Sequence, residues 1–206
     1  MEIKIVEGAR PGTNALLEKA FRLRHKVFVE EKKWEALRKA DRREIDEFDR
    51  PQCIYIIAVE KKSVIGQMRM TPTTGPHLLA NVHFNLCSRP EPRGPSVWEW
   101  TRYCVRPLAR GRTPWGEVAA HVQLAGMEWL HIHGVNDIVV EYHPKFIQRH
   151  LELGFEVNPL GLPTEIEGEP VVAVHMRFDF NTLHRTRKTF GVHNPILMKG
   201  PNVFAV

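Results

Sequence analysis

VWEWTRYCVRP, residues 97–107, is the stretch from which the architecture of this chain follows. Its β-branched and aromatic residues predict a β-strand that ends before Pro107, because proline lacks the N–H that a strand donates. Glu99 and Arg102 nevertheless interrupt the apolar strand, three residues apart. Strict alternation would place these two side chains on opposite faces of the sheet. If both serve one site, the strand must contain a β-bulge close to residues 102–105.

The composition is that of an ordinary globular protein. Its 206 residues, 43% of them hydrophobic and 26% charged, suit one domain that spans residues 1–206. No segment approaches the roughly 18 to 20 consecutive apolar residues of a transmembrane helix. The first ten residues lack the basic segment and apolar run of a secretory signal. We therefore expect a cytoplasmic protein that does not bind a membrane.

Charge and cysteine content narrow the classes of partner only slightly. The net charge of +5 fits a polyanionic partner such as nucleic acid, a CoA phosphate tail or an acidic carrier protein, and it equally fits none. The basic run HRTRK at 184–188 is not accompanied by a helix-turn-helix, zinc-finger or RNP signature, so we expect no nucleic-acid partner. The three cysteines form no CxxC pair, and we expect no disulfide framework, metal ion or other cofactor.

The hydrophobic pattern predicts an α/β (α+β) fold with a mixed sheet. Strands and helices alternate, except that two consecutive strands form a hairpin around Lys61 and Lys62. The sheet should therefore be antiparallel first, with a parallel step after the longest helix. This order resembles the three-layer fold of GCN5-related N-acetyltransferases. The predicted elements are strands at 2–6, 53–60, 63–70, 97–105, 136–142, 154–157 and 171–178, helices at 14–30, 78–84, 114–133 and 144–152, and a polar tail.

The helix at 114–133 is the clearest of these elements. Thr113 can cap it, Pro114 suits its first position, and Gly134 suits its exit. Its apolar residues step by three and four and so form one buried stripe. The stripe consists of Val118, Val122, Ala125, Trp129 and Ile132.

Charged residues occupy positions where the pattern predicts a core. Arg24 continues the apolar stripe of the helix at 14–30, between Phe21 and Phe28. A single arginine there could extend its head group to the surface. Five further charged residues interrupt apolar segments, however, so one mutually paired cluster is the simplest arrangement. They are Asp46, Asp49, Arg69, Glu99 and Arg102. Such a cluster either only fixes the fold or binds a zwitterionic ligand, and the residues alone leave both interpretations open.

These residues, in this order, resemble the hallmark positions of the LuxI-type acyl-homoserine-lactone synthases, which make quorum-sensing signals. The resemblance covers roughly residues 20 to 155. The matching positions are Arg24, Phe28 in RHKVFVEE, Trp34, Asp46 and Asp49 in IDEFD, Arg69 in GQMRMTPT, and Glu99 and Arg102 in WEWTR. The resemblance implies an N-acetyltransferase-like fold and a two-step reaction. An acyl group passes from acyl-CoA or acyl carrier protein to the amine of S-adenosylmethionine, and the carboxylate then closes the lactone and releases methylthioadenosine.

The resemblance also implies roles for the matching residues. Glu99 is the candidate general base, and Arg102 is the second candidate catalytic residue. An arginine could hold the substrate carboxylate, and the aspartates could attract the ammonium or brace the arginines. Phe28 and Trp34 could contact the sulfonium and adenine, or could simply pack in the core. The candidate S-adenosylmethionine-binding residues are Arg24, Phe28, Trp34, Asp46, Asp49, Arg69 and Thr101.

The acyl thioester should lie where the sheet opens at its parallel step. The basic segment at 106–112 precedes a helix N-terminus and suits a phosphopantetheine arm. Residues 138–142 contain no threonine, which relatives that prefer 3-oxo chains tend to carry there, so we expect an unsubstituted short, branched or aromatic acyl group that arrives on CoA. The candidate acyl-binding residues are Phe84, Tyr103, Val105, Arg110, Leu124, Met127, Tyr142 and Phe146.

The sequence leaves two alternative activities open. A generic N-acyltransferase that acts on another amine would share the fold without needing the full set of arginines and aspartates. An acyl-enzyme on Cys104 would need a histidine partner, which the sequence does not indicate, and a buried structural thiol is the simpler interpretation.

Overall fold

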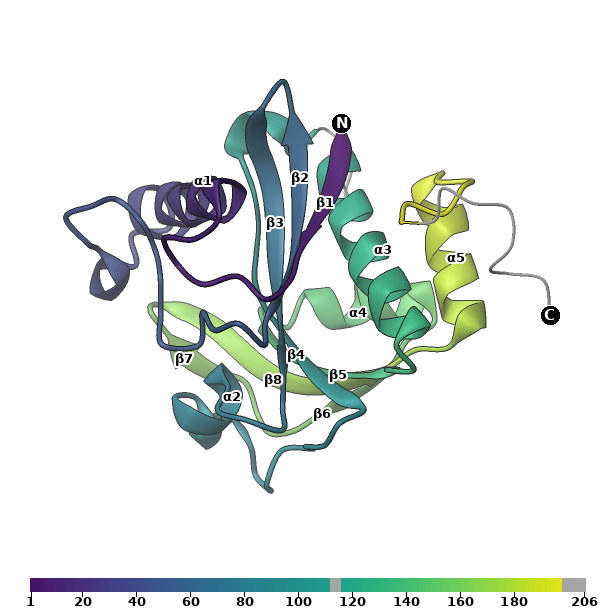
Figure 1. The fold of residues 1–206 in the computed structure, drawn as a ribbon. Helices are drawn as coiled ribbons and strands as arrows, with labels where there is room; N and C mark the ends of the chain where they lie inside the picture. The colour runs from purple at the N-terminus through teal and green to yellow at the C-terminus, as the bar shows by residue number, and fades with distance from the viewer. Residues whose placement is uncertain (112–115, 198–206) are drawn as a thin grey trace.

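The computed structural model describes residues 1–111 and 116–197, and its centre is one open, mixed β-sheet between layers of helices (Figure 1). The strands are β1 (Glu2–Val6), β2 (Ile54–Glu60), β3 (Ser63–Pro72), β4 (Val97–Val105), β5 (Asp137–Tyr142), β6 (Glu156–Pro159), β7 (Thr164–Ile166) and β8 (Glu169–Arg177). They lie in the order β1-β2-β3-β4-β5-β8-β6, and β7 pairs with β8. Only β4 and β5 pair in parallel among these strands. The predicted mixed sheet with one parallel step is confirmed.

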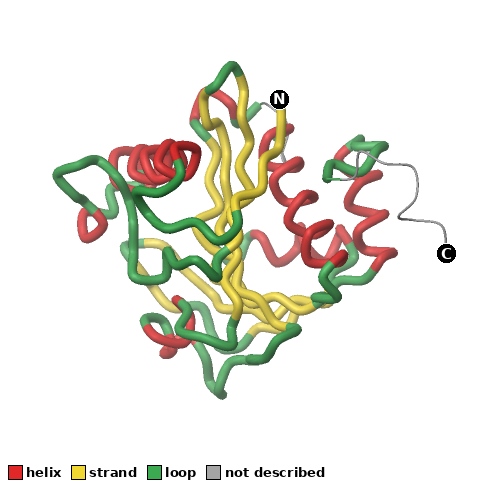
Figure 2. The backbone as a smooth tube through the Cα atoms, viewed as in Figure 1, coloured by secondary structure: helices red, strands yellow, loops and turns green. Residues whose placement is uncertain are grey.

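The helices cover both faces of this sheet. Figure 1 shows α1 on one side of the β2–β3 hairpin and α3 on the other, with α5 beside α3. Figure 2 shows that the chain between α1 and β2 is mostly loop. The helices are α1 (Ala15–Arg24), α2 (Leu78–Asn81), α3 (Glu117–Ile132), α4 (Phe146–Leu153) and α5 (Phe180–Phe190), and a π-helical turn follows α1 at His25–Glu31. No helix within residues 1–111 and 116–197 has the length and apolar character to cross a lipid bilayer.

Helix α1 carries its arginine into the core, as its apolar stripe predicts. The Asn14 side chain accepts the N–H groups of Leu16 and Leu17 at 2.9 and 3.0 Å and so caps the helix. Phe21 and Arg24 are completely buried against the sheet. Arg24 therefore does not extend to the surface, and its charge must be balanced inside the protein.

Helix α3 lies between the sheet and α5, and nearly its whole circumference is buried. Four residues of the predicted stripe are buried, whereas Ile132 is 46% exposed. Gly134 adopts a φ of 71° at the helix exit, as expected for a glycine in that position. The predicted cap Thr113 and the predicted first residue Pro114 lie outside the described residues.

Two predictions about the rest of the chain differ in their outcome. The hairpin is confirmed, and its two turn residues, Lys61 and Lys62, have positive φ values of 46° and 65°. The prediction of a polar tail after the last strand is wrong, because this segment forms helix α5. The Asp179 side chain accepts the N–H of Thr182 in a capping box that starts this helix. Leu183 is completely buried, so α5 packs onto the protein despite its polar composition.

Candidate active site

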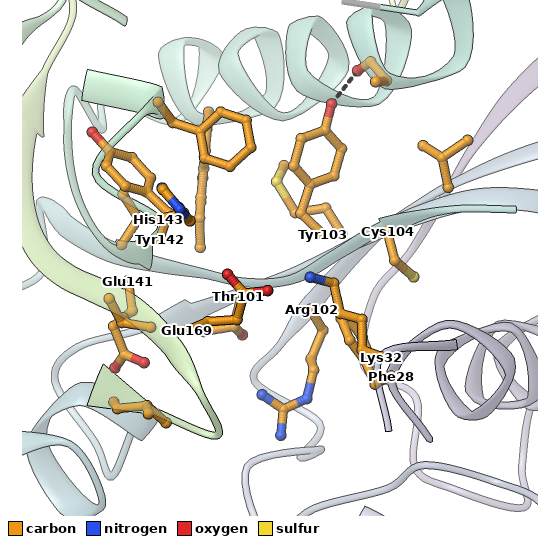
Figure 3. Close-up of a pocket in the computed structure, with 18 of the residues that line it drawn as sticks. Phe28, Lys32, Thr101, Arg102, Tyr103, Cys104, Glu141, Tyr142, His143 and Glu169 are labelled. Atoms are coloured by element: carbon orange, nitrogen blue, oxygen red, sulfur yellow. Dashed lines mark hydrogen bonds between the residues drawn. The ribbon is translucent and has the colours of Figure 1, made fainter. Parts of the chain in front are cut away.

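A β-bulge in β4 brings the consecutive side chains of Thr101 and Arg102 to one face of the sheet, where Thr101 contacts Arg69 and Arg102 contacts Asp46. Arg69 pairs with Thr101 and Gln67 with Cys104. The chain therefore advances by two residues on β3 where it advances by three residues on β4. Arg102 has a φ of 54°, the left-handed conformation common in bulges. The bulge predicted close to residues 102–105 is confirmed. Figure 3 shows Arg102 and Tyr103 extending to opposite sides of the strand.

Arg102 joins a cluster of three arginines and three carboxylates, which we call the arginine–carboxylate cluster. Its members are Arg24, Arg69, Arg102, Glu44, Asp46 and Asp49. Arg24 contacts Asp49 in a bidentate manner at 2.7 and 3.0 Å, and its Nε also donates to Glu44. Arg102 contacts Asp46 at 2.9 Å and Glu44 at 3.2 Å. The predicted pairing of Arg102 with the Arg24 and aspartate residues is therefore confirmed.

Arg69 completes this cluster from β3. Its Nη1 donates to Asp46 and lies 3.1 Å from Asp49, while its Nε donates to Thr101 at 3.0 Å. The hydroxyl of Tyr55 donates to Asp49 at 2.9 Å. Three positive and three negative charges cancel, which is how so many charged groups can be buried together.

The cluster keeps its two aspartates ionised. Burial alone would raise the pKa of Asp49, but attraction from Arg24 and Arg69 outweighs it and holds that pKa well below its usual range. The pKa of Asp46 is lowered in the same way, against burial, by Arg69 and Arg102. Near neutral pH, both aspartates are therefore charged and can brace the arginines.

A cavity of about 690 Å³ opens where β4 and β5 diverge, beyond their last parallel pair, Trp100 and Val140. Side chains from both faces of the sheet line it (Figure 3). On the α1 face these include Phe28, Trp34 and Arg102, and on the α3 face they include Tyr103, Tyr142 and Phe146. The opening thus joins two compartments through the sheet.

The structure divides the predicted S-adenosylmethionine-binding residues into two groups. Three of the seven line the cavity, Phe28, Trp34 and Thr101, and the predicted catalytic residue Arg102 lines it with them. Phe28 and Trp34 stack with ring centroids 5.2 Å apart and an interplanar angle of 10°. The other four, Arg24, Asp46, Asp49 and Arg69, do not line the cavity and lie behind Arg102 and Thr101 in the cluster. Within the described residues, two buried polar atoms of this group have no hydrogen-bond partner, Nη2 of Arg69 and Oδ2 of Asp46, although the latter lies 2.9 Å from Nη2 of Arg102.

Glu99 is not part of the arginine–carboxylate cluster. Its two carboxylate oxygens accept the N–H groups of Leu78 and Leu79 at 3.1 and 2.7 Å, at the start of α2. Burial raises the pKa of Glu99 to about 7, although these hydrogen bonds act against the shift. The side chain is completely buried and does not line the cavity. The expectation that Glu99 is the cluster's third acid is wrong, because Glu44 occupies that place.

Five of the eight predicted acyl-binding residues line the cavity, namely Tyr103, Val105, Arg110, Tyr142 and Phe146. The other three do not. Leu124 and Met127 are completely buried and pack in the main core, and Phe84 is 65% exposed. From α3 it is instead Ala119 and Gln123 that face the cavity, one helical turn apart.

The mouth of the cavity carries basic groups, as the segment at 106–112 predicts. Arg110 lines the cavity and is held by Glu31 through contacts from both Nη atoms, the Nη2 contact at 2.7 Å. Lys32 lines the same side of the opening. Arg112 lies outside the described residues.

Sequence reasoning missed three features of the site. Glu44 was overlooked, although it stands two residues before Asp46 in the same charged segment. Tyr55 gave no signal, because it looks like any aromatic residue of a strand. His83 and Glu141 form an ion pair that lines the cavity, and this hydrogen bond raises the pKa of His83. Their partnership joins residues 58 positions apart, and no local pattern shows it.

Comparison with known proteins gives a consistent picture. A family model described as autoinducer synthase matches residues 11–186. The isovaleryl-homoserine lactone synthase of Bradyrhizobium diazoefficiens is 34% identical over 192 residues, which cover 93% of this chain and 86% of that protein. An acyl-homoserine-lactone synthase of Pseudomonas aeruginosa is 30% identical over 162 residues, 78% of each chain.

Solved structures agree with these relatives. A CoA-dependent acyl-homoserine lactone synthase, BjaI, solved with SAM and isopentyl-CoA, superposes with a TM-score of 0.86 at 32% identity, covering 98% of this chain and 95% of that chain. A putative N-acetyltransferase from Lactobacillus plantarum superposes with a TM-score of 0.55 at 23% identity, covering 86% and 100%.

The fold and the site therefore define an acyltransferase with an N-acetyltransferase-like architecture. Within that class, the chain belongs to the autoinducer synthase family, whose curated relatives are acyl-homoserine-lactone synthases.

Proposed function

We propose that this protein synthesises an N-acyl-homoserine lactone from S-adenosylmethionine and an acyl-CoA. The observation that carries the proposal is the cavity that passes through the sheet between β4 and β5. One compartment offers Arg102 and the stacked rings of Phe28 and Trp34, which suit a carboxylate and a sulfonium-bearing nucleoside. The other compartment is lined by aromatic rings such as those of Tyr103 and Tyr142, which suit an acyl chain.

The chemistry requires two bond exchanges. The amine nitrogen attacks the thioester carbonyl carbon, the C–S bond breaks, and CoA leaves as its thiol with the proton that the amine gives up. The carboxylate oxygen then attacks the γ-carbon, the bond to the sulfonium breaks, and methylthioadenosine leaves. The second step needs no proton transfer, so positioning of the carboxylate is the protein's main contribution to it.

Glu99 is the proposed proton acceptor in the first step. A carboxylate with a pKa of about 7 suits proton abstraction near neutral pH. Since Glu99 is buried beside the cavity rather than on its wall, we propose that one water molecule connects it to the amine. The bulge at Arg102 interrupts the β3–β4 ladder, and we propose that a freed backbone N–H there polarises the thioester carbonyl.

Relatives support CoA as the carrier and a small acyl group. The BjaI structure was solved with isopentyl-CoA, and the Bradyrhizobium relative is an isovaleryl-homoserine lactone synthase. In this chain, Tyr142 packs beside Phe146 with ring centroids 6.0 Å apart, and we propose that this pair limits the length of the acyl compartment. We propose that the acyl donor is a short, branched or aromatic acyl-CoA. Acyl carrier protein is the alternative donor, which the assay must exclude. We also propose that the protein acts in the cytoplasm as a single synthase domain, without a cofactor and without nucleic acid.

The test is release of methylthioadenosine and of the lactone, measured by chromatography and mass spectrometry. The purified protein is incubated with S-adenosylmethionine and matched panels of acyl-CoA and acyl carrier protein donors. Arg102→Met should lower kcat/KM at least a hundredfold, whereas the exposed Arg177→Met, which loses only an ion pair with Asp137, should not. Absence of methylthioadenosine with every donor would overturn the proposal. Acylation of another amine without it would favour a generic N-acyltransferase.

A further inference from the structure

The acylation step of the proposed reaction sets free one proton that its products do not carry. An α-amino group has an ordinary pKa of about 7.7–8.0, so the substrate amine is mostly an ammonium near neutral pH. It must lose one proton before it attacks the thioester and a second proton as the amide forms. The thiol of CoA takes up the second proton. The first proton must therefore reach solvent.

Glu99, the proposed acceptor, is separated from the cavity by the wall that holds it. Its side chain is completely buried, and its carboxylate oxygens accept the N–H groups of Leu78 and Leu79. Leu78 itself lines the cavity, so Glu99 lies directly behind that wall. Glu99 must be unprotonated again before it can accept the second proton. A neighbouring group that reaches the cavity is therefore needed to carry the first proton away.

The ion pair of His83 and Glu141 lies beside Glu99. Glu99 pairs in register with Val139 on the parallel strand β5. Glu141 follows Val139 by two residues, so its side chain extends from the same face of the sheet as Glu99. The N–H of His83 donates to the carbonyl of Leu78 at 3.2 Å, in the same turn of chain whose N–H groups hold Glu99. The pair and Glu99 thus belong to one small region of the sheet surface.

This pair has the arrangement of a proton carrier. Nδ1 of His83 is hydrogen-bonded to Oε2 of Glu141, and because a carboxylate accepts, Nδ1 carries the proton and Nε2 of the neutral ring is an acceptor. The His83 side chain is 24% exposed and lines the cavity together with Glu141 (Figure 3). His83 is therefore accessible to water, unlike Glu99.

The charges around His83 favour proton uptake. The hydrogen bond from Nδ1 to Glu141 is the largest cause of the raised pKa of His83, and the negative charge of Glu99 adds to the shift. Burial and the positive charge of Arg102 oppose it without reversing it. The negative charge of Glu141 also contributes, after burial, to the raised pKa of Glu99. The two groups therefore sense each other's charge, and both can take up and release a proton near neutral pH.

We propose that the His83–Glu141 pair carries the first proton from Glu99 to solvent. The proton passes from Glu99 through water to Nε2 of His83, and the new N–H bond then breaks as the proton joins water in the cavity. The electron pair of that bond stays on Nε2, and Glu99 is again a carboxylate when the amide forms. This inference rests on the proposed function, and it makes His83 and Glu141 residues that act through Glu99 rather than on the substrates.

The experiment measures how the defect of His83→Gln varies with pH. Glutamine still offers Glu141 an N–H donor, but it does not accept a proton near neutral pH. At about pH 6.5 nearly all of the substrate amine is protonated, and we expect kcat/KM for methylthioadenosine release to fall about tenfold or more. At about pH 8.5 most of the substrate arrives as the free amine and needs no first transfer, so the loss should shrink to less than about twofold. Enzyme-free reactions at each pH correct for spontaneous release.

His175→Gln is the matched control. His175 also contacts a carboxylate, that of Asp137 at 2.8 Å, but it does not line the cavity. Its replacement should leave kcat/KM unchanged at both pH values.

Chemical rescue of His83→Ala provides a second measurement. Imidazole added at about pH 6.5 should restore activity in proportion to its concentration, because it can carry the proton from the open cavity. Pyrazole has a ring of similar size that is not protonated near pH 7, and it should not restore activity. Equal rescue by both compounds would indicate a structural role and would count against the inference.

The pH dependence separates failure of this inference from failure of the proposed function. Full activity of His83→Gln at about pH 6.5, or an equal loss at both pH values, would overturn the inference and leave the synthase function intact. Absence of methylthioadenosine release from the wild-type protein with every donor would instead overturn the function itself.

Discussion

Replacement of Glu44 by glutamine tests whether the arginine–carboxylate cluster is held together by charge balance. The side chain of Glu44 is 1% exposed and contacts both Arg24 and Arg102. Glutamine keeps the volume but leaves three guanidinium groups against two carboxylates. Loss of one partner from a buried ion pair typically costs about 3–5 kcal/mol. For a domain of this size, that corresponds to a fall in Tm of roughly 6–20 °C.

The assay is urea and thermal unfolding, with Glu47→Gln as the matched control. Glu47 lies three residues further along the same loop and is exposed. Its replacement should change the free energy of unfolding by no more than about 0.5 kcal/mol. If Glu44→Gln also fell within about 1 kcal/mol of the wild type, the charge-balance account would be refuted.

A double-mutant cycle locates the effect within the cluster. If Arg102→Met is already present, Glu44 has one cation fewer to neutralise, so its loss should cost less. The expected coupling between the two positions is about 0.5–3 kcal/mol, because the side chains are in direct contact. Strict additivity would mean that Arg102 is not stabilised by Glu44.

Three further predictions follow from the protonation states of buried groups. Because the folded-state pKa of Asp49 is lowered, the free energy of unfolding should fall as pH drops below about 5, and Asp49→Asn should weaken this dependence in pH-resolved urea titrations. Because Glu99 must be unprotonated to act as a base, kcat/KM should rise with pH and level off above about 7, and Glu99→Gln should lower it about 10²- to 10⁴-fold and abolish that limb of the profile. Burial raises the pKa of the Cys104 thiol to about 12, so Cys104→Ala should retain most methylthioadenosine release. Loss of this release in the variant would instead support an acyl-enzyme on Cys104.

The buried charges were predictable because helices and strands have fixed periods. The helical period places Arg24 on the apolar face of its helix. Strand alternation places Glu99 and Arg102 on opposite faces of the sheet unless the strand contains a bulge between them. The identity of the third acid was not predictable. Glu44 reaches Arg24 from a loop whose path follows no period, so its partners depend on the folded chain.

The residues of α3 that line the cavity could not be predicted from the sequence, for a different reason. Helix α3 is buried nearly all round, so its apolar pattern does not distinguish residues that face the cavity from those that face the core. Leu124 and Gln123 are neighbours in sequence, yet only Gln123 lines the cavity. By contrast, the signal for α5 was present in the sequence. Asp179 and Thr182 have capping-box spacing, but few apolar residues follow them.

The single parallel pairing explains why one site can use both faces of the sheet. The parallel ladder between β4 and β5 ends at Trp100 and Val140, and β4 then continues with β3 while β5 continues with β8. The bulge directly after this point rotates β4, so that Arg102 faces the cluster and Tyr103 faces α3. A closed ladder would separate an amine on one face from a thioester on the other. The divergence of the strands and the bulge together allow the two substrates to meet within one sheet.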